Sequence, residues 1–174
     1  DSDQVVGLAV NDLVELPPDK PSTPDLAPDS DTGTSNDDNL TSDTTPTFTG
    51  TAEASSTVQL FAGSSDLGTT TADSSGNWSF TVDSSDALSD GSHSMTATAT
   101  DAAGNVSSAS DGLTITIDTA APATPSKPDL DASSDTGRSN SDNITSITTP
   151  TFTGTADADS TIEVFAGSSS LGTI

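Results

Sequence analysis

GSHSMTATATD, residues 91–101, gives the clearest indication of how this chain folds. Within it, Met95, Ala97 and Ala99 are separated by single threonines, so apolar and polar residues alternate strictly. Alternation with a period of two is the pattern of a β-strand that has one face buried and the other in water, where threonine is favoured. The stretch therefore predicts a half-buried strand that ends at the turn sequence beginning at Asp101.

Four further runs alternate in the same way, and they lie at residues 47–49, 57–62, 78–82 and 113–117. Turn sequences rich in Gly, Asn, Asp and Ser separate them, and no stretch carries an apolar stripe with helical spacing. With short edge strands expected near residues 25–30 and 67–72, the count is about seven strands in about 100 residues. The sequence predicts an all-β fold, an immunoglobulin-like β-sandwich whose core is anchored by Trp78.

The sequence of this sandwich is repeated along the chain. Residues 24–70 return as residues 128–174 at a constant offset of 104, with 33 of the 47 positions identical. We interpret residues 1–17 as an N-terminal segment or linker and residues 18–127 as a complete repeat. Residues 128–174 are then the truncated N-terminal part of a second repeat, which is expected not to bury a core alone. Tandem copies provide length and spacing, so they favour a structural or adhesive protein over an enzyme.

The charge of the chain restricts its partners. The 27 acidic and three basic residues give a net charge of −24, which disfavours nucleic acid and anionic membranes and attracts cations. No apolar run approaches the ~20 residues that membrane insertion needs. A disordered acidic tail is the alternative, and the regular placement of the apolar residues argues against it. With no Cys and a single His, we expect no enzymatic activity. No signal peptide is visible, which fits an internal fragment or export by a C-terminal signal lying elsewhere.

The segment DSDTGTSNDDN, residues 29–39, begins like a calcium-binding loop. Carboxylates two residues apart, followed by a glycine for the bend, can converge on one hard cation that prefers oxygen ligands. We expect Ca²⁺ ligands at Asp31, Asn36 and Asp38, and at Asp135 and Asp142 in the second copy. Asp29 is the weaker candidate because the second copy has Ser133 there. The alternative is a solvated loop in which Asp and Asn side chains cap turns.

Two further acidic clusters are candidate calcium sites. One comprises Asp101 and Asn105, in a turn, and the other is Asp118, at the end of the last predicted strand. Head-to-tail stacking of sandwiches would bring Asp118 and the loop at residues 29–39 of one copy toward Asp157 and Asp159 of the next. Like charges gathered there would be costly unless a cation lay between them.

Several motifs together resemble the bacterial immunoglobulin-like repeats of giant surface adhesins. They are SDTGxSxxDNxT, TTPTFTGTA, GNWSF, DGSHSMTATATDAAGNVS and LTITIDTAAPATP, and they cover nearly the whole chain from Pro18 onward. The resemblance implies very long proteins exported by type I secretion, with tandem sandwiches, calcium near the domain junctions, an extracellular or cell-surface location, and roles in attachment and biofilm.

These observations lead to two functional hypotheses. In the first, the chain is a calcium-stabilised structural extender repeat of a bacterial cell-surface adhesin. Its partners are then neighbouring repeats and calcium ions, with the host or surface ligand bound elsewhere in the parent protein. In the second, it is an accessory, polysaccharide-binding module of a secreted enzyme. A sugar-binding module would expose aromatic residues, whereas most aromatic residues here fall on the predicted core face.

Overall fold

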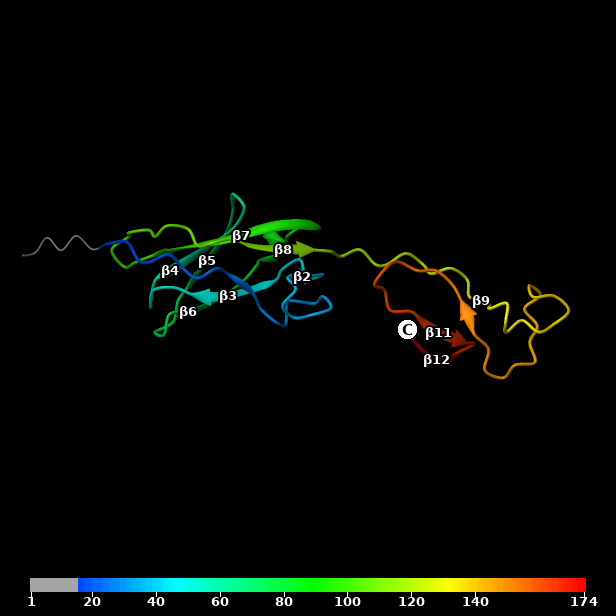
Figure 1. The fold of residues 1–174 in the computed structure, drawn as a ribbon. Helices are drawn as coiled ribbons and strands as arrows, with labels where there is room; N and C mark the ends of the chain where they lie inside the picture. Colours follow the sequence, from blue (N-terminus) through cyan, green and yellow to red (C-terminus); the bar gives the residue numbers. More distant parts are fainter. Residues whose placement is uncertain (1–15) are drawn as a thin grey trace, which may run out of the picture. The chain divides into compact units, whose positions relative to one another are not determined.

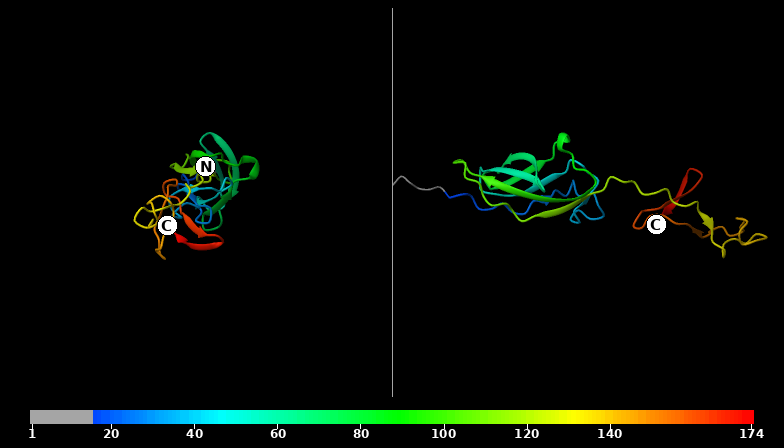
Figure 2. Two further views of the ribbon diagram at one scale, coloured as in Figure 1. Left: turned by 90° about the vertical axis from the view of Figure 1, so that its right-hand side faces the viewer. Right: turned by 90° about the horizontal axis from the view of Figure 1, so that it is seen from above.

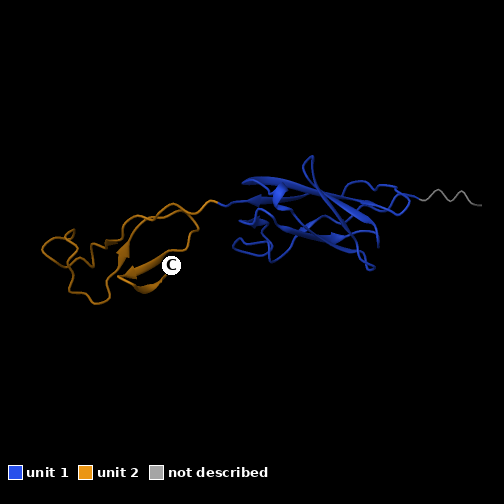
Figure 3. Cartoon of the chain, turned by 180° about the vertical axis from the view of Figure 1, so that it is seen from behind, with its two compact units in different colours: residues 1–119 blue, residues 120–174 orange. Residues whose placement is uncertain are grey.

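The computed structural model describes residues 16–174, so the predicted segment at residues 1–17 falls almost wholly outside the described residues. The chain divides into two compact units, unit 1 (residues 1–119) and unit 2 (residues 120–174) (Figure 3). The repeat comparison starts the second copy at residue 128. Unit 2 begins earlier, and two residues before 128 are bonded to the rest of it. The Ser126 amide donates to the Thr155 carbonyl at 2.8 Å, and the Ala123 amide donates to the Asp157 carboxylate at 2.6 Å.

Unit 1 is a sandwich of two sheets (Figure 1). Its eight strands are β1 (Asp25–Leu26), β2 (Leu40–Thr41), β3 (Thr47–Thr51), β4 (Thr57–Ala62), β5 (Ser65–Thr71), β6 (Asn77–Thr81), β7 (Gly91–Thr100) and β8 (Leu113–Ile117). One sheet has the order β1-β3-β6 and the other β2-β8-β7-β4-β5, and a 3-10 turn, η1 (Ser84–Asp86), connects β6 to β7. The predicted all-β, immunoglobulin-like sandwich is confirmed.

The core of unit 1 comes from the alternating apolar positions. Phe48, Met95 and Ile115 have no exposed surface, and Trp78 is 3 % exposed, as its predicted anchoring role requires. Burial of each large side chain contributes about 1.5–3 kcal/mol. Gly50, opposite Trp78 in the pairing of β3 with β6, makes this packing possible, because a Cβ there would lie 2.5 Å from the indole Cζ2.

The eighth strand was not predicted. β2 is two residues long and lies at the end of the acidic loop, where no alternation marks it. It pairs in parallel with β8, and flanking backbone bonds run from the Thr116 amide to the Asn39 carbonyl and from the Asp118 amide to the Thr41 carbonyl, both 2.9 Å. The acidic loop is thereby fixed to the end of the last strand.

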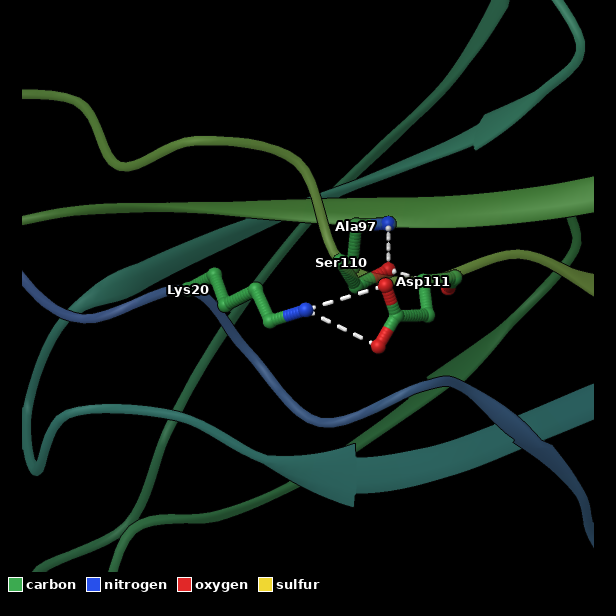
Figure 4. Close-up of polar contacts among 4 residues, drawn as sticks. All are labelled: Lys20, Ala97, Ser110 and Asp111. Carbon is green, nitrogen blue, oxygen red and sulfur yellow. Dashed lines mark hydrogen bonds and ion pairs between the residues drawn. The ribbon is translucent and has the colours of Figure 1, made fainter.

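Serine side chains cover the part of the β7 edge that β8 leaves unpaired. The Ser110 hydroxyl accepts the Ala97 amide at 2.9 Å (Figure 4), and the Ser107 hydroxyl accepts the Ala99 amide at the same distance. Covering an edge in this way hides strand donors from other chains. Beside Ser110, Lys20 forms an ion pair with Asp111 at 2.8 Å, also drawn in Figure 4.

Unit 2 repeats the first half of unit 1 with shorter strands. They are β9 (Asp129–Leu130), β10 (Phe152–Thr153), β11 (Glu163–Ala166) and β12 (Ser169–Thr173), and they form two separate antiparallel pairs. Their registers reproduce those of unit 1: Leu130 faces Phe152 as Leu26 faces Phe48. Leu130 is the one buried hydrophobic side chain among the described residues of this unit. Residues 118–128, yellow-green in Figure 2, contain no strand.

Candidate functional site

The acidic loop of unit 1, residues 29–39, is shaped by Asp38. Its Oδ1 accepts the Leu40 amide, and its Oδ2 accepts the Ser35 amide, each at 3.1 Å, so the carboxylate closes the turn. Gly33 leaves the space for this, because a Cβ there would lie 2.5 Å from Asp38 Oδ1 and 2.9 Å from the Leu40 carbonyl oxygen. Asn39 has φ +59°, a left-handed conformation that asparagine tolerates better than most residues.

Asp31 is the unusual member of this loop. It is only 6 % exposed, and its Oδ2 accepts the Asn39 amide at 3.1 Å, whereas its Oδ1 is buried without a hydrogen-bond partner. Burial, aided by the neighbouring carboxylates of Asp38 and Asp37, raises the pKa of Asp31. Hydrogen bonds, with that from the Leu40 amide first, lower the pKa of Asp38. The two carboxylates are neighbours, because each contributes to the pKa shift of the other.

Unit 2 builds the same arrangement. Asp135 is 7 % exposed, its Oδ2 accepts the Asn143 amide at 3.0 Å, and its Oδ1 is again buried without a partner. Asp142 accepts the Ser139 and Ile144 amides as Asp38 accepts those of Ser35 and Leu40. Asn143 has φ +57°. An unpartnered buried carboxylate oxygen is rare enough to need an explanation, and here it occurs twice in one chain.

The chemistry of this carboxylate pair is of the kind that a hard cation prefers, and calcium binding here stays a prediction. Ca²⁺ takes six to eight oxygen ligands, and a buried oxygen beside a second carboxylate is a donor set of the right chemistry. Within residues 16–174, however, no three Asp, Glu, His or Cys side chains come together as a metal-binding group. The two carboxylates would therefore need neutral oxygens and water to complete the coordination. Asn36, predicted as a ligand, is exposed on the same loop.

The cluster of Asp101 and Asn105 is a hydrogen-bonded turn. The Asp101 carboxylate accepts the Ala103 amide at 2.9 Å and, from Asn105, both the backbone amide at 2.8 Å and the side-chain amide at 2.9 Å. These donors, with the Asn105 side chain first, lower the pKa of Asp101. Asp73 closes the related turn DSSGN in the same way. Calcium binding at Asp101 and Asn105 stays a prediction.

The remaining candidates lie in different places. Asp118 follows β8, and its amide bond to Thr41 puts it beside the end of the acidic loop in unit 1. In unit 2, the Asp157 carboxylate accepts the Ala123 amide, and Asp159 has φ +61°, like Ser55 at the equivalent position with φ +65°. The meeting of these two residues with the preceding copy stays a prediction.

Sequence reasoning missed the polar residues that attach the loop to the sandwich. The buried Ser30 hydroxyl accepts the Thr47 amide at 3.0 Å and donates to Asp43 at 3.2 Å, and the buried Thr41 hydroxyl donates to the Ser30 carbonyl. In unit 2, Ser134 accepts the Thr151 amide at 2.9 Å. Because Ser30 and Ser134 occupy equivalent positions in the two copies, comparison of the repeats could have identified them. The chain contains many other, exposed serines, so this agreement did not distinguish them.

A family profile described as the bacterial Ig-like domain matches residues 17–119 and again residues 122–174. The chain belongs to the family of bacterial Ig-like domains, in agreement with its sandwich and its internal repeat. A comparison with curated proteins finds no match. Domains of this family are typically non-catalytic and often belong to extracellular or surface proteins. In the described part of the chain, no helix has the length and hydrophobicity needed to cross a membrane.

Proposed function

We propose that this chain is a calcium-stabilised structural extender from a bacterial cell-surface adhesin that acts in attachment and biofilm formation. Its role is mechanical: neighbouring repeats provide length, calcium stiffens them, and the adhesive ligand binds elsewhere in the parent protein. The observation that carries the proposal is the buried, unpartnered oxygen of Asp31 beside Asp38, which recurs at Asp135 and Asp142.

The mechanism follows from the charge of the loop. Without a cation, two neighbouring carboxylates repel each other, and one of them is shielded from water. Bound calcium would neutralise the pair and supply the missing partner of the buried oxygen. Sites in extracellular modules bind calcium with Kd of about 10⁻⁴–10⁻³ M, which suits two carboxylates supplemented by neutral ligands.

An accessory sugar-binding module receives less support. Sugar recognition uses exposed aromatic rings, and in unit 1 Phe48 and Trp78 are buried while Phe61 and Phe80 are half-buried. Domains of this family are typically non-catalytic, so we expect no turnover from this chain.

The test is thermal unfolding of the full chain in chelator and then in millimolar calcium at constant ionic strength. Trp78 is the single tryptophan, so its fluorescence follows unit 1 alone. Calcium at ten to a hundred times Kd should stabilise the unit by about 1.4–2.7 kcal/mol for each site. Because about 1 kcal/mol corresponds to about 4–8 °C in a domain of this size, the gain should be readily measured.

Two variants distinguish coordination of calcium by Asp31 from a general effect of negative charge in the loop. Asp31→Asn keeps the shape of the side chain and should abolish most of the calcium response. Asp29→Ser removes the same charge from the same loop and copies Ser133 of the second repeat, so it should leave the response intact. A Tm that calcium and sodium raise equally, or an equal loss in both variants, would leave the loop as a set of solvated turns.

A further inference from the structure

Residues 18–27, which we call the proline strap, run along the edge of the three-stranded sheet of unit 1 and include β1. Prolines recur in the strap at every third position, and Pro18, Pro21 and Pro24 are all buried. A polyproline helix has three residues per turn, so the three prolines share one face, and that face packs against the sandwich. Because proline has no amide hydrogen, such a segment has few backbone donors for its neighbour.

Ser22, which lies between two of the buried prolines, attaches the strap to β3. Its amide donates to the Thr51 carbonyl, and its hydroxyl accepts the Thr51 amide, both at 2.9 Å. At the other end of the strap, the Ala27 amide donates to the Thr47 carbonyl at 2.9 Å. The strap is therefore bonded to β3 along the whole length of that strand.

The strap also closes the core beside Trp78. A Cβ on Gly50 would lie 2.5 Å from the indole and 2.9 Å from the Ser22 hydroxyl, so the strap and the indole approach the same glycine. Leu26, within β1, is 2 % exposed and belongs to the same core cluster as Trp78. Removal of the strap would uncover this core, so we expect the rest of unit 1 to unfold with it.

The strap and β8 run in the same direction through unit 1. The strap begins near the start of β8, because Lys20 forms its ion pair with Asp111. Just after the strap, the Ser30 carbonyl accepts the Thr41 hydroxyl, and Thr41 faces Ile117 at the end of β8. The chain thus enters unit 1 at one end of its strands and leaves at the other, as the blue strap and β8 show in Figure 1.

Tension in the chain would therefore act along the strands of unit 1. The hydrogen bonds of an antiparallel pair lie perpendicular to its strands. A pull on the start of the strap would slide it along β3 and load the bonds at Ser22 and Ala27 together. This geometry is shear, in which several bonds must break at once.

We propose that unit 1 bears tension along the chain and that the proline strap, loaded in shear against β3, is the element that limits its strength. The other end of the unit is held by more bonds. β8 pairs with β7 at five positions and with β2 at two, and the Asp90 carboxylate accepts both the amide and the hydroxyl of Thr119. Tension should remove the strap first. This inference rests on the proposed role as an extender, which carries load, but not on calcium.

The test is single-molecule unfolding of the full chain at constant force in chelator, with handles on introduced cysteines, since the chain has none of its own. With Leu16→Cys and Ala121→Cys, both at exposed positions, the force shears the strap along β3. With Leu16→Cys and Glu53→Cys, the second handle lies just beyond the end of β3 that holds Ser22, so the same bonds open one after another. Unfolding at the same force should be about tenfold or more faster in the second geometry, because forced unfolding follows the unfolding barrier.

A matched pair of serine variants identifies the bonds that carry the load. Ser22→Ala and Ser110→Ala each remove a hydroxyl that accepts a strand amide at 2.9 Å, that of Thr51 on β3 and that of Ala97 on β7. With handles at residues 16 and 121, Ser22→Ala should raise the unfolding rate by about fivefold, the effect of one lost hydrogen bond, and Ser110→Ala by less than about twofold. Urea unfolding of both variants gives the loss of stability that does not depend on the direction of force.

Two outcomes would overturn the proposal: equal unfolding rates in the two pulling geometries, or equal acceleration by the two serine variants. Because calcium is absent from the measurement, either outcome would leave the calcium response of the acidic loop to be decided by its own test.

Discussion

Phe48 and Phe152 lie in the same sequence, TTPTFTGTA, yet one side chain is fully buried and the other is 44 % exposed. The loops of the two units show no such difference. The left-handed residues Asn39 and Asn143 have φ values of +59° and +57°, and Asp31 and Asp135 are buried to nearly the same extent. Loop conformation therefore repeats where core burial does not.

The difference follows from the range of the interactions involved. The acidic loop is closed by bonds between residues two to eight positions apart, such as those from the Leu40 amide to Asp38 and from the Asn39 amide to Asp31. Burial of Phe48, in contrast, needs β6 on the same sheet and β7 and β8 on the facing one, all distant in sequence. A short segment can thus specify the conformation of the acidic loop without a complete core around it.

The largest expected effect tests this contrast directly. Phe48→Ala should lower the free energy of unfolding of unit 1 by about 3–5 kcal/mol, because it empties a filled core position. Phe152→Ala should leave the unfolding of unit 1 unchanged and accelerate amide exchange around β10 by less than about tenfold, since its ring is already half in water. The measurement is urea unfolding followed by Trp78 fluorescence, together with hydrogen exchange. Similar losses from both substitutions would mean that the units differ less in packing than their burial indicates.

The sequence-based expectations were accurate for features that the local sequence determines and incomplete for features that depend on distant residues. Strands β4 and β8 were predicted to the residue because alternation is local. β2 was missed because only its pairing with β8, some 75 residues away, defines it. Asp31 and Asp38 were predicted as calcium ligands, which stays a prediction, and the burial of one Asp31 oxygen could not be foreseen because it depends on the surrounding fold. Sequence alone also could not separate the turn at Asp101 from that at Asp73, because both have the pattern D-x-x-G-N.

A second prediction concerns the carboxylate pair without metal. In chelator at neutral pH, Asp31→Asn should stabilise unit 1 by about 1 kcal/mol, which is about 4–8 °C in Tm. The side-chain oxygen of the introduced asparagine can still accept the Asn39 amide. Its NH₂ group can donate a hydrogen bond to Asp38, whereas the Asp31 carboxylate repels Asp38. The matched Asp135→Asn should not change the melting of unit 1. A lower Tm for Asp31→Asn in chelator would show that the buried oxygen already has a favourable partner.

A smaller effect is expected in the pH dependence of unit 1 in chelator. Because the folded pKa of Asp31 is raised, its ionisation destabilises the fold at neutral pH, and this penalty is relieved as pH falls through that pKa toward 3.8. Asp38, Asp73 and Asp101 have lowered pKa values, so the stability they contribute is lost only below about 3.8. Urea unfolding across this range should give maximal stability at weakly acidic pH, and Asp31→Asn should flatten the rise. A maximum at neutral pH would contradict the assignment.

The smallest effect should come from the ion pair of Lys20 with Asp111, which unit 2 lacks because Thr124 stands at the equivalent position. The two side chains are 49 % and 77 % exposed, so the pair is worth about 0.2–1 kcal/mol at most. The segment that carries Lys20 is already held by buried Pro21 and by the bonds between Ser22 and Thr51. Lys20→Thr should therefore lower the free energy of unfolding of unit 1 by about 0.5 kcal/mol, and the loss should shrink near 1 M salt, where the Debye length is about 3 Å. A loss above about 2 kcal/mol that salt does not reduce would mean that this segment docks through the ion pair, and that its absence from unit 2 contributes to the weaker packing there.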